Sequence, residues 1–373
     1  MSSSDPQLPH PNERITLIGL GAIGISFLAL HLRYTSAQIT VYDPRPDLED
    51  HITSILPLYL SGHNLTVAEA RKSGRLHISN SLESAVSRAT IVQEQGPERV
   101  EFKQNLWRQV LNHADTKCRL WSSTSGIEAS RQLAGLERDG EGDGDGDGDG
   151  DGSTTWADKV SSARSRLLIV HPFNPPHIMP LLELVPSPWT DEAEVSFAQT
   201  YFSALASGHR PIVVHKEIKG FVANRLSFIL LREACHLVDQ GVVSVQECDE
   251  IIRASLGPRW AVKGIFEMYG FGGGNAGIKG FFNNIGHSIA DVWEDDPRHV
   301  QMNIEGRSAS STAEATTGGQ GQPSTWLEKV IAQSDEAFGL PTPQAITARD
   351  RGLNMVVKAQ AEMQRLDRQE KES

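Results

Sequence analysis

The chain has 373 residues, 39% of them hydrophobic, and a formal net charge of −12 at pH 7. This length can bury a sizeable core, and it predicts two or three domains of an ordinary globular protein. The composition excludes a basic surface for nucleic acid or anionic lipid, and the apolar runs are too short to span a membrane.

The cysteines and the N-terminal stretch indicate a reducing compartment. Cys118, Cys235 and Cys248 are odd in number and lack metal-ligand spacing, so we expect small core residues rather than disulfides or a metal site. Residues 1–13 are polar and have neither the apolar segment of a secretory signal nor an Arg-rich amphipathic pattern. We therefore expect a cytoplasmic protein with a disordered N-terminus over residues 1–13.

The first chemical signal follows directly. Residues 15–18 are an apolar strand, and a glycine-rich turn then opens a helical run that continues to Leu32. A strand, a tight turn and a helix N-terminus in this order receive the pyrophosphate of a dinucleotide. A flavin would use the same turn, but nothing later in the chain supports one. The candidate cofactor contacts here are Gly19, Gly21, Ala22, Ile23 and Gly24.

A carboxylate at the end of the next strand selects the cofactor. Asp43 closes the strand at 38–42, nineteen residues after Gly24. A carboxylate at this place accepts hydrogen bonds from the adenosine ribose and repels a 2′-phosphate, so the sequence favours NAD over NADP. Arg45 complicates this preference only slightly, because it lies past Asp43 and between two prolines.

The N-terminal half reads as a Rossmann-type α/β domain over residues 14–218. Short apolar strands alternate with helical stretches, as a doubly wound parallel sheet requires. Residues 47–75 have helical spacing broken by Gly62, and they predict a helical hairpin between the second and third strands. The expected strands are 14–18, 38–42, 90–95, 119–123, 167–171, 181–186 and 210–215.

An acidic insert interrupts this domain at residues 137–160. Seven of the chain's acidic residues alternate with glycine between Asp139 and Asp151, so we expect a disordered surface loop. Asp147, Asp149 and Asp151 do fall at positions 1, 3 and 5 of an EF-hand-like loop. The twelfth position is Asp158 rather than Glu, however, so a solvated linker is favoured over a calcium site.

The most informative stretch is residues 167–185. His171 and Glu183 lie on two apolar, strand-like segments, where an imidazole and a carboxylate can meet as a base and the group that orients it. The alternatives are a buried histidine with a purely structural role and a surface glutamate on an edge strand. The pair predicts a catalytic site.

After Lys219 the pattern becomes helical only, which predicts a helical C-terminal domain over residues 219–373. Apolar residues recur at helical spacing in four segments, and residues 303–324 are expected to be a flexible loop. The helical faces are more apolar than one small domain needs, so we expect a homodimer through this domain. The helical segments are 220–239, 245–252, 326–338 and 347–364.

Together these motifs resemble the 3-hydroxyacyl-CoA dehydrogenase superfamily, and most of all its lambda-crystallin, or L-gulonate 3-dehydrogenase, branch. The resemblance runs from about residue 14 to residue 300 outside the acidic insert. It rests on the ordered motifs at 19–24, 92–98 with Lys103, 122–125, 171–183 and 216–225, the last of which contains Gly220-Phe221-Val222-Ala223-Asn224-Arg225.

The resemblance implies specific roles. His171 and Glu183 would form the catalytic dyad, and Ser125 and Asn224 would hold the reacting oxygen. Ser125 also suits a turn in which it caps backbone groups. The positions that match cofactor contacts are Glu98, Lys103 and Asn174, of which Glu98 and Lys103 would also be unremarkable as a solvated charge pair.

The substrate follows from departures within these motifs. The fatty acyl-CoA branch reads H-F-F-N-P and N-T-S-S, whereas this chain has His171-Pro172-Phe173-Asn174-Pro175 and Ser123-Thr124-Ser125-Gly126. These departures favour NAD-dependent oxidation of a small free 3-hydroxy acid such as L-gulonate. The alternatives are a 3-hydroxyacyl-CoA or L-carnitine dehydrogenase, and a non-catalytic dinucleotide-binding protein similar to a crystallin.

Overall fold

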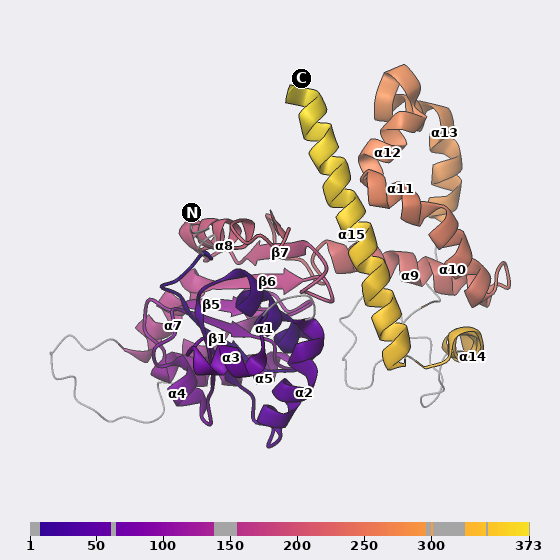
Figure 1. Ribbon diagram of the computed structural model, residues 1–373. Helices are drawn as coiled ribbons and strands as arrows, with labels where there is room; N and C mark the ends of the chain where they lie inside the picture. The colour runs from indigo at the N-terminus through magenta and orange to yellow at the C-terminus, as the bar shows by residue number, and fades with distance from the viewer. Residues whose placement is uncertain are drawn as a thin grey trace. The chain divides into compact units, whose positions relative to one another are not determined.

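Figure 1 shows the computed structural model of the chain, which describes residues 8–60, 65–137, 155–295, 300, 325–340 and 342–372. The chain forms two compact units, Met1–Arg225 and Leu226–Ser373. The first is α/β and the second is helical in its described residues. Within the described part of the chain, no helix combines the length and apolar character that a membrane span needs.

The first unit is built on one eight-stranded sheet with the strand order β3-β2-β1-β4-β5-β6-β7-β8. All seven expected strands are present. The sequence prediction missed β3, which has only three residues and carries the polar His77 in its middle. The strands are β1 Arg14–Ile18, β2 Gln38–Tyr42, β3 Leu76–Ile78, β4 Ile91–Glu94, β5 Arg119–Ser122, β6 Leu167–Pro172, β7 Leu181–Pro186 and β8 Arg210–Val213.

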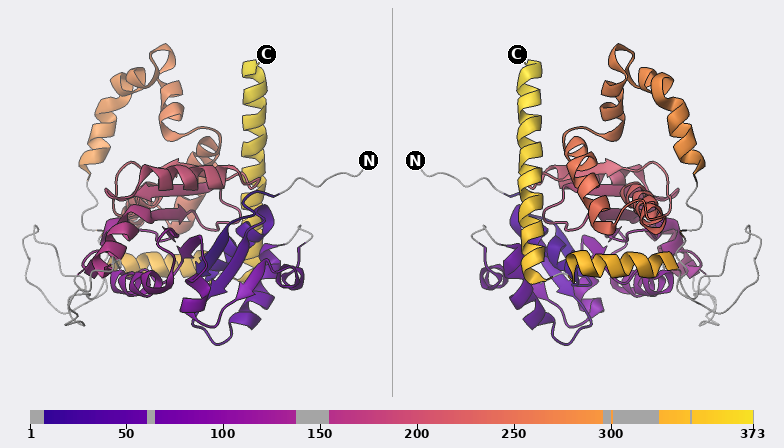
Figure 2. Two further views of the ribbon diagram at one scale, coloured as in Figure 1. Left: turned by 90° about the vertical axis from the view of Figure 1, so that its left-hand side faces the viewer. Right: turned by 90° about the vertical axis from the view of Figure 1, so that its right-hand side faces the viewer.

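Helices cover both faces of this sheet, as Figure 2 shows. One core cluster joins the sheet to α1, α2 and α8, and another joins it to α4, α5, α6 and α7. The expected hairpin at 47–75 is present as α2 and α3. The helices are α1 Ala22–Tyr34, α2 Leu48–Tyr59, α3 Val67–Lys72, α4 Leu82–Val86, α5 Val100–His113, α6 Ala129–Gln132, α7 Trp156–Arg166 and α8 Glu192–Ser203.

The expectation of a wholly parallel sheet is wrong at one pair, because β7 runs antiparallel to β6. Only residues 173–180 connect these strands, which is too short for the crossover that a parallel neighbour requires. The next strand, β8, pairs parallel to β7 after the crossover helix α8.

Two expected disordered segments are partly ordered. In the stretch 1–13, Pro9 accepts a hydrogen bond from the backbone of Ser36, and the His10 ring stacks on Tyr201. In the insert expected over 137–160, Thr155 and Asp158 form a capping box that starts α7. The Asp-Gly tract over 139–152 and residues 303–324 lie wholly outside the described residues, as do the calcium positions before Asp158.

The second unit contains helices alone in its described residues, as expected. Its first helix, α9, begins in the first unit, just past the boundary expected at residue 218. Cys235 and Cys248 are buried here, as Cys118 is in the first unit, and all three are free thiols. The helices are α9 Ala223–Asp239, α10 Val245–Ala254, α11 Leu256–Val262, α12 Ile265–Gly272, α13 Gly277–Glu294, α14 Thr325–Phe338 and α15 Pro343–Glu372.

Candidate active site

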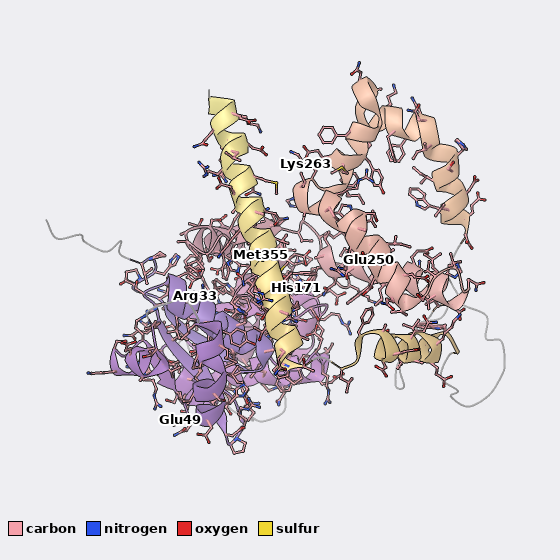
Figure 3. The ribbon with its side chains drawn as sticks, turned by 45° about the vertical axis from the view of Figure 1, so that its right-hand side comes forward. Arg33, Glu49, His171, Glu250, Lys263 and Met355 are labelled. Carbon is pink, nitrogen blue, oxygen red and sulfur yellow. The ribbon has the colours of Figure 1, made fainter. Side chains whose placement is uncertain are left out.

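The antiparallel pairing of β6 and β7 places His171 directly opposite Glu183. His171 Nδ1 lies 2.8 Å from Glu183 Oε2, and both side chains are buried. His171 is labelled in Figure 3. Burial alone would raise the pKa of Glu183, but hydrogen bonds from His171 and from two backbone N–H groups outweigh it and lower that pKa. Glu183 is therefore a carboxylate, and it accepts the Nδ1 proton of the imidazole.

The second oxygen of Glu183 binds the start of α9. Glu183 Oε1 accepts hydrogen bonds from the backbone N–H groups of Val222 and Ala223, at 2.9 and 3.0 Å. A carboxylate is well placed there, because the first N–H groups of a helix lack partners and carry partial positive charge. The ring of Phe221, fully buried, lies 5.2 Å from that of His171. Glu183 thus fixes the imidazole relative to the head of α9.

The dyad borders a pocket of about 370 Å³. Its walls come from the carboxyl end of β6, from the loops that follow β4, β5 and β6, and from the first turns of α1 and α9. The strand order reverses between β1 and β4, and this is where ligands bind in open α/β sheets. The lining residues are Ile23, Gln95, Gly96, Glu98, Ser123, Ser125, His171, Pro172, Phe173, Asn174 and Asn224.

The structure brings Ser125 and Asn224 to the dyad. Asn224 Nδ2 donates to the carbonyl of Ser125 at 3.1 Å and lies 3.5 Å from His171 Nε2. The Nε2 nitrogen of His171 and the Asn224 carboxamide therefore meet at the pocket wall, where a substrate oxygen can contact both. Asn174 lies on the same wall.

Glu98 organises the turn that carries Ser125. Its Oε1 accepts hydrogen bonds from the backbone N–H groups of Ser125 and Gly126 and from the hydroxyls of Thr124 and Ser125. Glu98 thus fixes Ser125 through its backbone N–H group. The Ser125 hydroxyl lies 3.3 Å from Glu98, and the residue lines the pocket.

Lys103 is completely buried, so it is not part of a solvated charge pair. Its ammonium lies 2.7 Å from Glu94 Oε1 and 3.9 Å from Glu98 Oε2. A buried charge is tolerated only when it is paired. Lys103 is not among the residues that line the pocket, but it lies beside Glu98, which is.

The glycine turn fits a dinucleotide. A Cβ on Gly24 would lie 1.9 Å from the carbonyl oxygen of Gly19, and Gly19 itself has a φ of +90°. A Cβ on Gly21 would meet nothing within 4 Å, so this residue faces open space at the start of α1. No side chain caps this helix, which leaves its first N–H groups for a phosphate. Ala22 and Ile23 begin this helix.

Asp43 lies beside this turn, as expected. Its Oδ2 accepts a hydrogen bond from the backbone N–H of Leu20 at 2.7 Å, and its Oδ1 accepts one from that of Arg45 at 3.0 Å. The carboxylate is therefore fixed against the turn, where the ribose of a bound dinucleotide would lie.

Sequence reasoning missed Gln95. Both polar atoms of its carboxamide are buried and have no hydrogen-bond partner among the described residues, and the residue lines the pocket beside Gly24. Unpaired buried amides cost roughly 1–3 kcal/mol each, so a ligand group is the partner that such atoms need. The repeated glutamines in Gln93-Glu94-Gln95 were the only sequence signal.

The chain matches one family in both halves. The profile of the 3-hydroxyacyl-CoA dehydrogenase NAD-binding domain covers residues 14–141 and 154–218, and that of the C-terminal domain covers residues 220–315. An L-carnitine dehydrogenase of Oceanobacillus iheyensis is 30% identical over 75% of this chain and 83% of its own length. One from Streptomyces coelicolor is 31% identical, over 76% and 81%.

A 3-hydroxyacyl-CoA dehydrogenase of Gibberella moniliformis is 30% identical over 76% of this chain and 80% of its own length. Among solved structures, 5-formyl-3-hydroxy-2-methylpyridine 4-carboxylic acid 5-dehydrogenase, described as an NAD⁺-dependent dismutase, has a TM-score of 0.61. The match covers 94% of this chain and 98% of the length of that protein, with 23% sequence identity. Because the identity is this low, the match supports the fold alone. The relatives do not support the lambda-crystallin branch in particular.

Proposed function

The chain belongs to the 3-hydroxyacyl-CoA dehydrogenase family, and on this basis we propose that it oxidises the 3-hydroxyl group of L-carnitine or a similar small, free 3-hydroxy acid. It is an NAD-dependent dehydrogenase that acts on a CH–OH group. The buried contact between His171 and Glu183 at the pocket carries the proposal.

The dyad supplies the base. With its Nδ1 proton donated to Glu183, His171 presents the Nε2 lone pair to the pocket. This nitrogen takes the proton of the substrate hydroxyl while the carbon loses its hydride, and the Glu183 carboxylate stabilises the imidazolium that forms. Asn224 Nδ2 donates to the oxygen as it becomes a carbonyl, and the Ser125 hydroxyl joins it by turning away from Glu98 Oε1, which keeps three other donors.

The glycine turn and Asp43 hold the cofactor. NAD, when bound, accepts the hydride. Gly21 and the first N–H groups of α1 bind its pyrophosphate, and Asp43 selects an unmodified adenosine ribose over a 2′-phosphate. Glu98 and Asn174 line the pocket and would contact the nicotinamide half of the cofactor.

The pocket wall supports a substrate with a cationic head. Among the described lining residues there is no lysine or arginine, whereas Glu98 supplies a carboxylate and Phe173 an aromatic ring. A quaternary ammonium group is attracted by an aromatic face and a nearby negative charge. This and the two relatives named as carnitine dehydrogenases favour carnitine over the L-gulonate-like substrate expected from the motifs.

A substrate panel tests the proposal. NADH formation is measured with L-carnitine, L-gulonate, 3-hydroxybutyrate and 3-hydroxybutyryl-CoA, each with NAD and with NADP. We expect the highest kcat/KM with L-carnitine and NAD. His171→Asn is run in parallel as the variant that should lose turnover while it still binds NADH.

The other outcomes are equally informative. A higher kcat/KM with 3-hydroxybutyryl-CoA than with any free acid would contradict the small-substrate proposal and favour the 3-hydroxyacyl-CoA alternative. No turnover of any substrate, despite NADH binding, would favour the non-catalytic alternative.

A further inference from the structure

Ser123 lines the catalytic pocket without having been assigned a role. Its hydroxyl oxygen accepts a hydrogen bond from Nε2 of Gln93 at 3.2 Å. Gln93 lies on β4 and is completely buried. Within the described part of the chain, Ser123 Oγ has no other hydrogen-bond partner, so its proton has none either.

The hydrogen bonds continue from Gln93 into the core. Gln93 Oε1 lies 3.1 Å from Nε2 of His31, on α1, and His31 Nδ1 lies 3.0 Å from the hydroxyl of Tyr201, on α8. Gln93, His31 and Tyr201 all have zero exposure to solvent. One chain of hydrogen bonds thus runs from the helical layer through the sheet to the pocket.

The direction of every bond in this chain follows from its members. Burial lowers the pKa of His31 to about 4, so the ring is neutral near pH 7 and has one donor and one acceptor nitrogen. Gln93 Oε1 can only accept, so His31 Nε2 carries the proton. His31 Nδ1 must then accept, and the Tyr201 hydroxyl donates to it.

We propose that Ser123 is a ligand-binding residue that donates its hydroxyl proton to an oxygen of the pocket's occupant, and that Gln93, His31 and Tyr201 are positioning residues that fix this direction. The acceptor is a carbonyl or carboxylate oxygen, found on the substrate acid and on the nicotinamide carboxamide of NAD. Because the Gln93 amide occupies an acceptor site of Ser123 Oγ, the Ser123 proton points elsewhere.

The burial of Tyr201 supports this direction. The reverse arrangement, with the Gln93 carboxamide turned over, would place the His31 proton on Nδ1 and commit the Ser123 proton to Gln93. The hydroxyl proton of the fully buried Tyr201 would then lose His31 Nδ1 as its acceptor. Only the orientation in this structure leaves a donor for a ligand at Ser123.

The His31 tautomer tests the direction without any substrate. In ¹⁵N-histidine-labelled protein at pH 7.5, the two ring nitrogens of a neutral imidazole have distinct chemical shifts, and His31→Asn assigns the signals. We expect a protonated Nε2 and an unprotonated Nδ1. The opposite tautomer would overturn the proposal, while the substrate assignment above would be unaffected.

Ser123→Ala tests the ligand contact. NADH affinity is measured by fluorescence titration, and KM and kcat with the best substrate of the panel. We expect a 3- to 10-fold loss, the effect of one hydrogen bond. A loss in NADH affinity assigns the acceptor to the cofactor, and a rise in KM alone assigns it to the substrate. No change in either would overturn the proposal.

Tyr201→Phe tests transmission along the chain, with Thr16→Val as the matched control. Thr16 is a buried residue whose hydroxyl donates to the Ala85 carbonyl, away from this pocket. Tyr201→Phe should convert part of His31 to the other tautomer and weaken the same parameter that Ser123→Ala weakens. Thr16→Val should lower the melting temperature alone. An unchanged His31 tautomer in Tyr201→Phe would contradict the positioning role.

Discussion

At the residue scale, Glu183 does two things at once. One oxygen holds the proton of His171 Nδ1, and the other accepts the backbone N–H groups of Val222 and Ala223. The orientation of the base is therefore tied to the point where α9 begins. A side chain of another length at position 183 would lose one contact to keep the other.

Gln95 yields a prediction in which stability and binding change in opposite directions. Gln95→Leu removes two buried atoms that have no partner in the described part of the chain, so the melting temperature of the free protein should stay the same or rise. NADH affinity should fall about 3- to 10-fold, because the ligand loses its hydrogen bonds to the amide. Thermal unfolding and fluorescence titration check the two effects.

The control for Gln95→Leu is Gln104→Leu on α5. The Gln104 amide is satisfied by the carbonyls of Arg131 and Ala134 and does not line the pocket. This variant should lose stability and keep its NADH affinity. If Gln95→Leu behaves in the same way, the amide is not a ligand contact.

At this scale, the sequence predicted the residues that belong to local motifs. It did not predict the residues that become neighbours only when the chain folds. His171, Glu183 and the glycines are recognisable from local spacing, and the structure places them at one pocket or beside it. Gln93, His31 and Tyr201 meet because the strand order and the helix layers bring distant segments together. No local pattern contains that information.

At the scale of elements, the hairpin of β6 and β7 matters most for the site. Its antiparallel register aligns residue 171 with residue 183 on the same face. The connection over 173–180 is too short for a parallel crossover, so the sequence already indicated an antiparallel pair here. The prediction of a parallel sheet did not take this length into account. The start of α7 was readable too, since Thr155 and Asp158 have capping-box spacing. The strand β3, with three residues, was too short to predict.

The burial of His31 between α1, β4 and α8 predicts a pH dependence of stability. Its pKa is about 4 in the folded protein, against 6.5 for the exposed side chain. Above pH 6.5 the ring is neutral in both states. As the pH falls from 6.5 towards 4, the unfolded chain binds the proton more readily, so stability is lost over this window.

Urea unfolding at pH 7.5 and pH 5 measures this effect. The contribution of His31 to the loss should be about 2 kcal/mol. His31→Asn should be less stable at pH 7.5 but should lose less stability between the two values. The control His113→Asn, at an exposed histidine, should keep the wild-type difference. An equal difference in wild type and His31→Asn would refute the assignment.

At the scale of the whole molecule, the second unit exposes large apolar side chains. Phe266 and Trp293 are each 77% exposed, and both line an apolar pocket of about 500 Å³ formed by α12 and α13. Soluble monomers rarely leave contiguous apolar surface of this kind uncovered, and closed twofold dimers are the commonest assembly. We therefore propose that the protein is a homodimer through its helical unit.

Sedimentation velocity tests this proposal. The wild type should sediment as a dimer, and the double variant Phe266→Asp, Trp293→Asp should shift the equilibrium towards the monomer. The control Leu58→Asp, at a residue 71% exposed in the first unit, should remain dimeric. A monomeric wild type at micromolar concentration would contradict the proposal.

The central claim is that the imidazole of His171 takes the substrate proton in a site that binds NAD by other groups. The most direct measurement compares His171→Asn with wild type for both NADH affinity and turnover of the best substrate. We predict nearly unchanged NADH affinity and a kcat about 10²- to 10⁴-fold lower. A variant that retains wild-type kcat would contradict the claim.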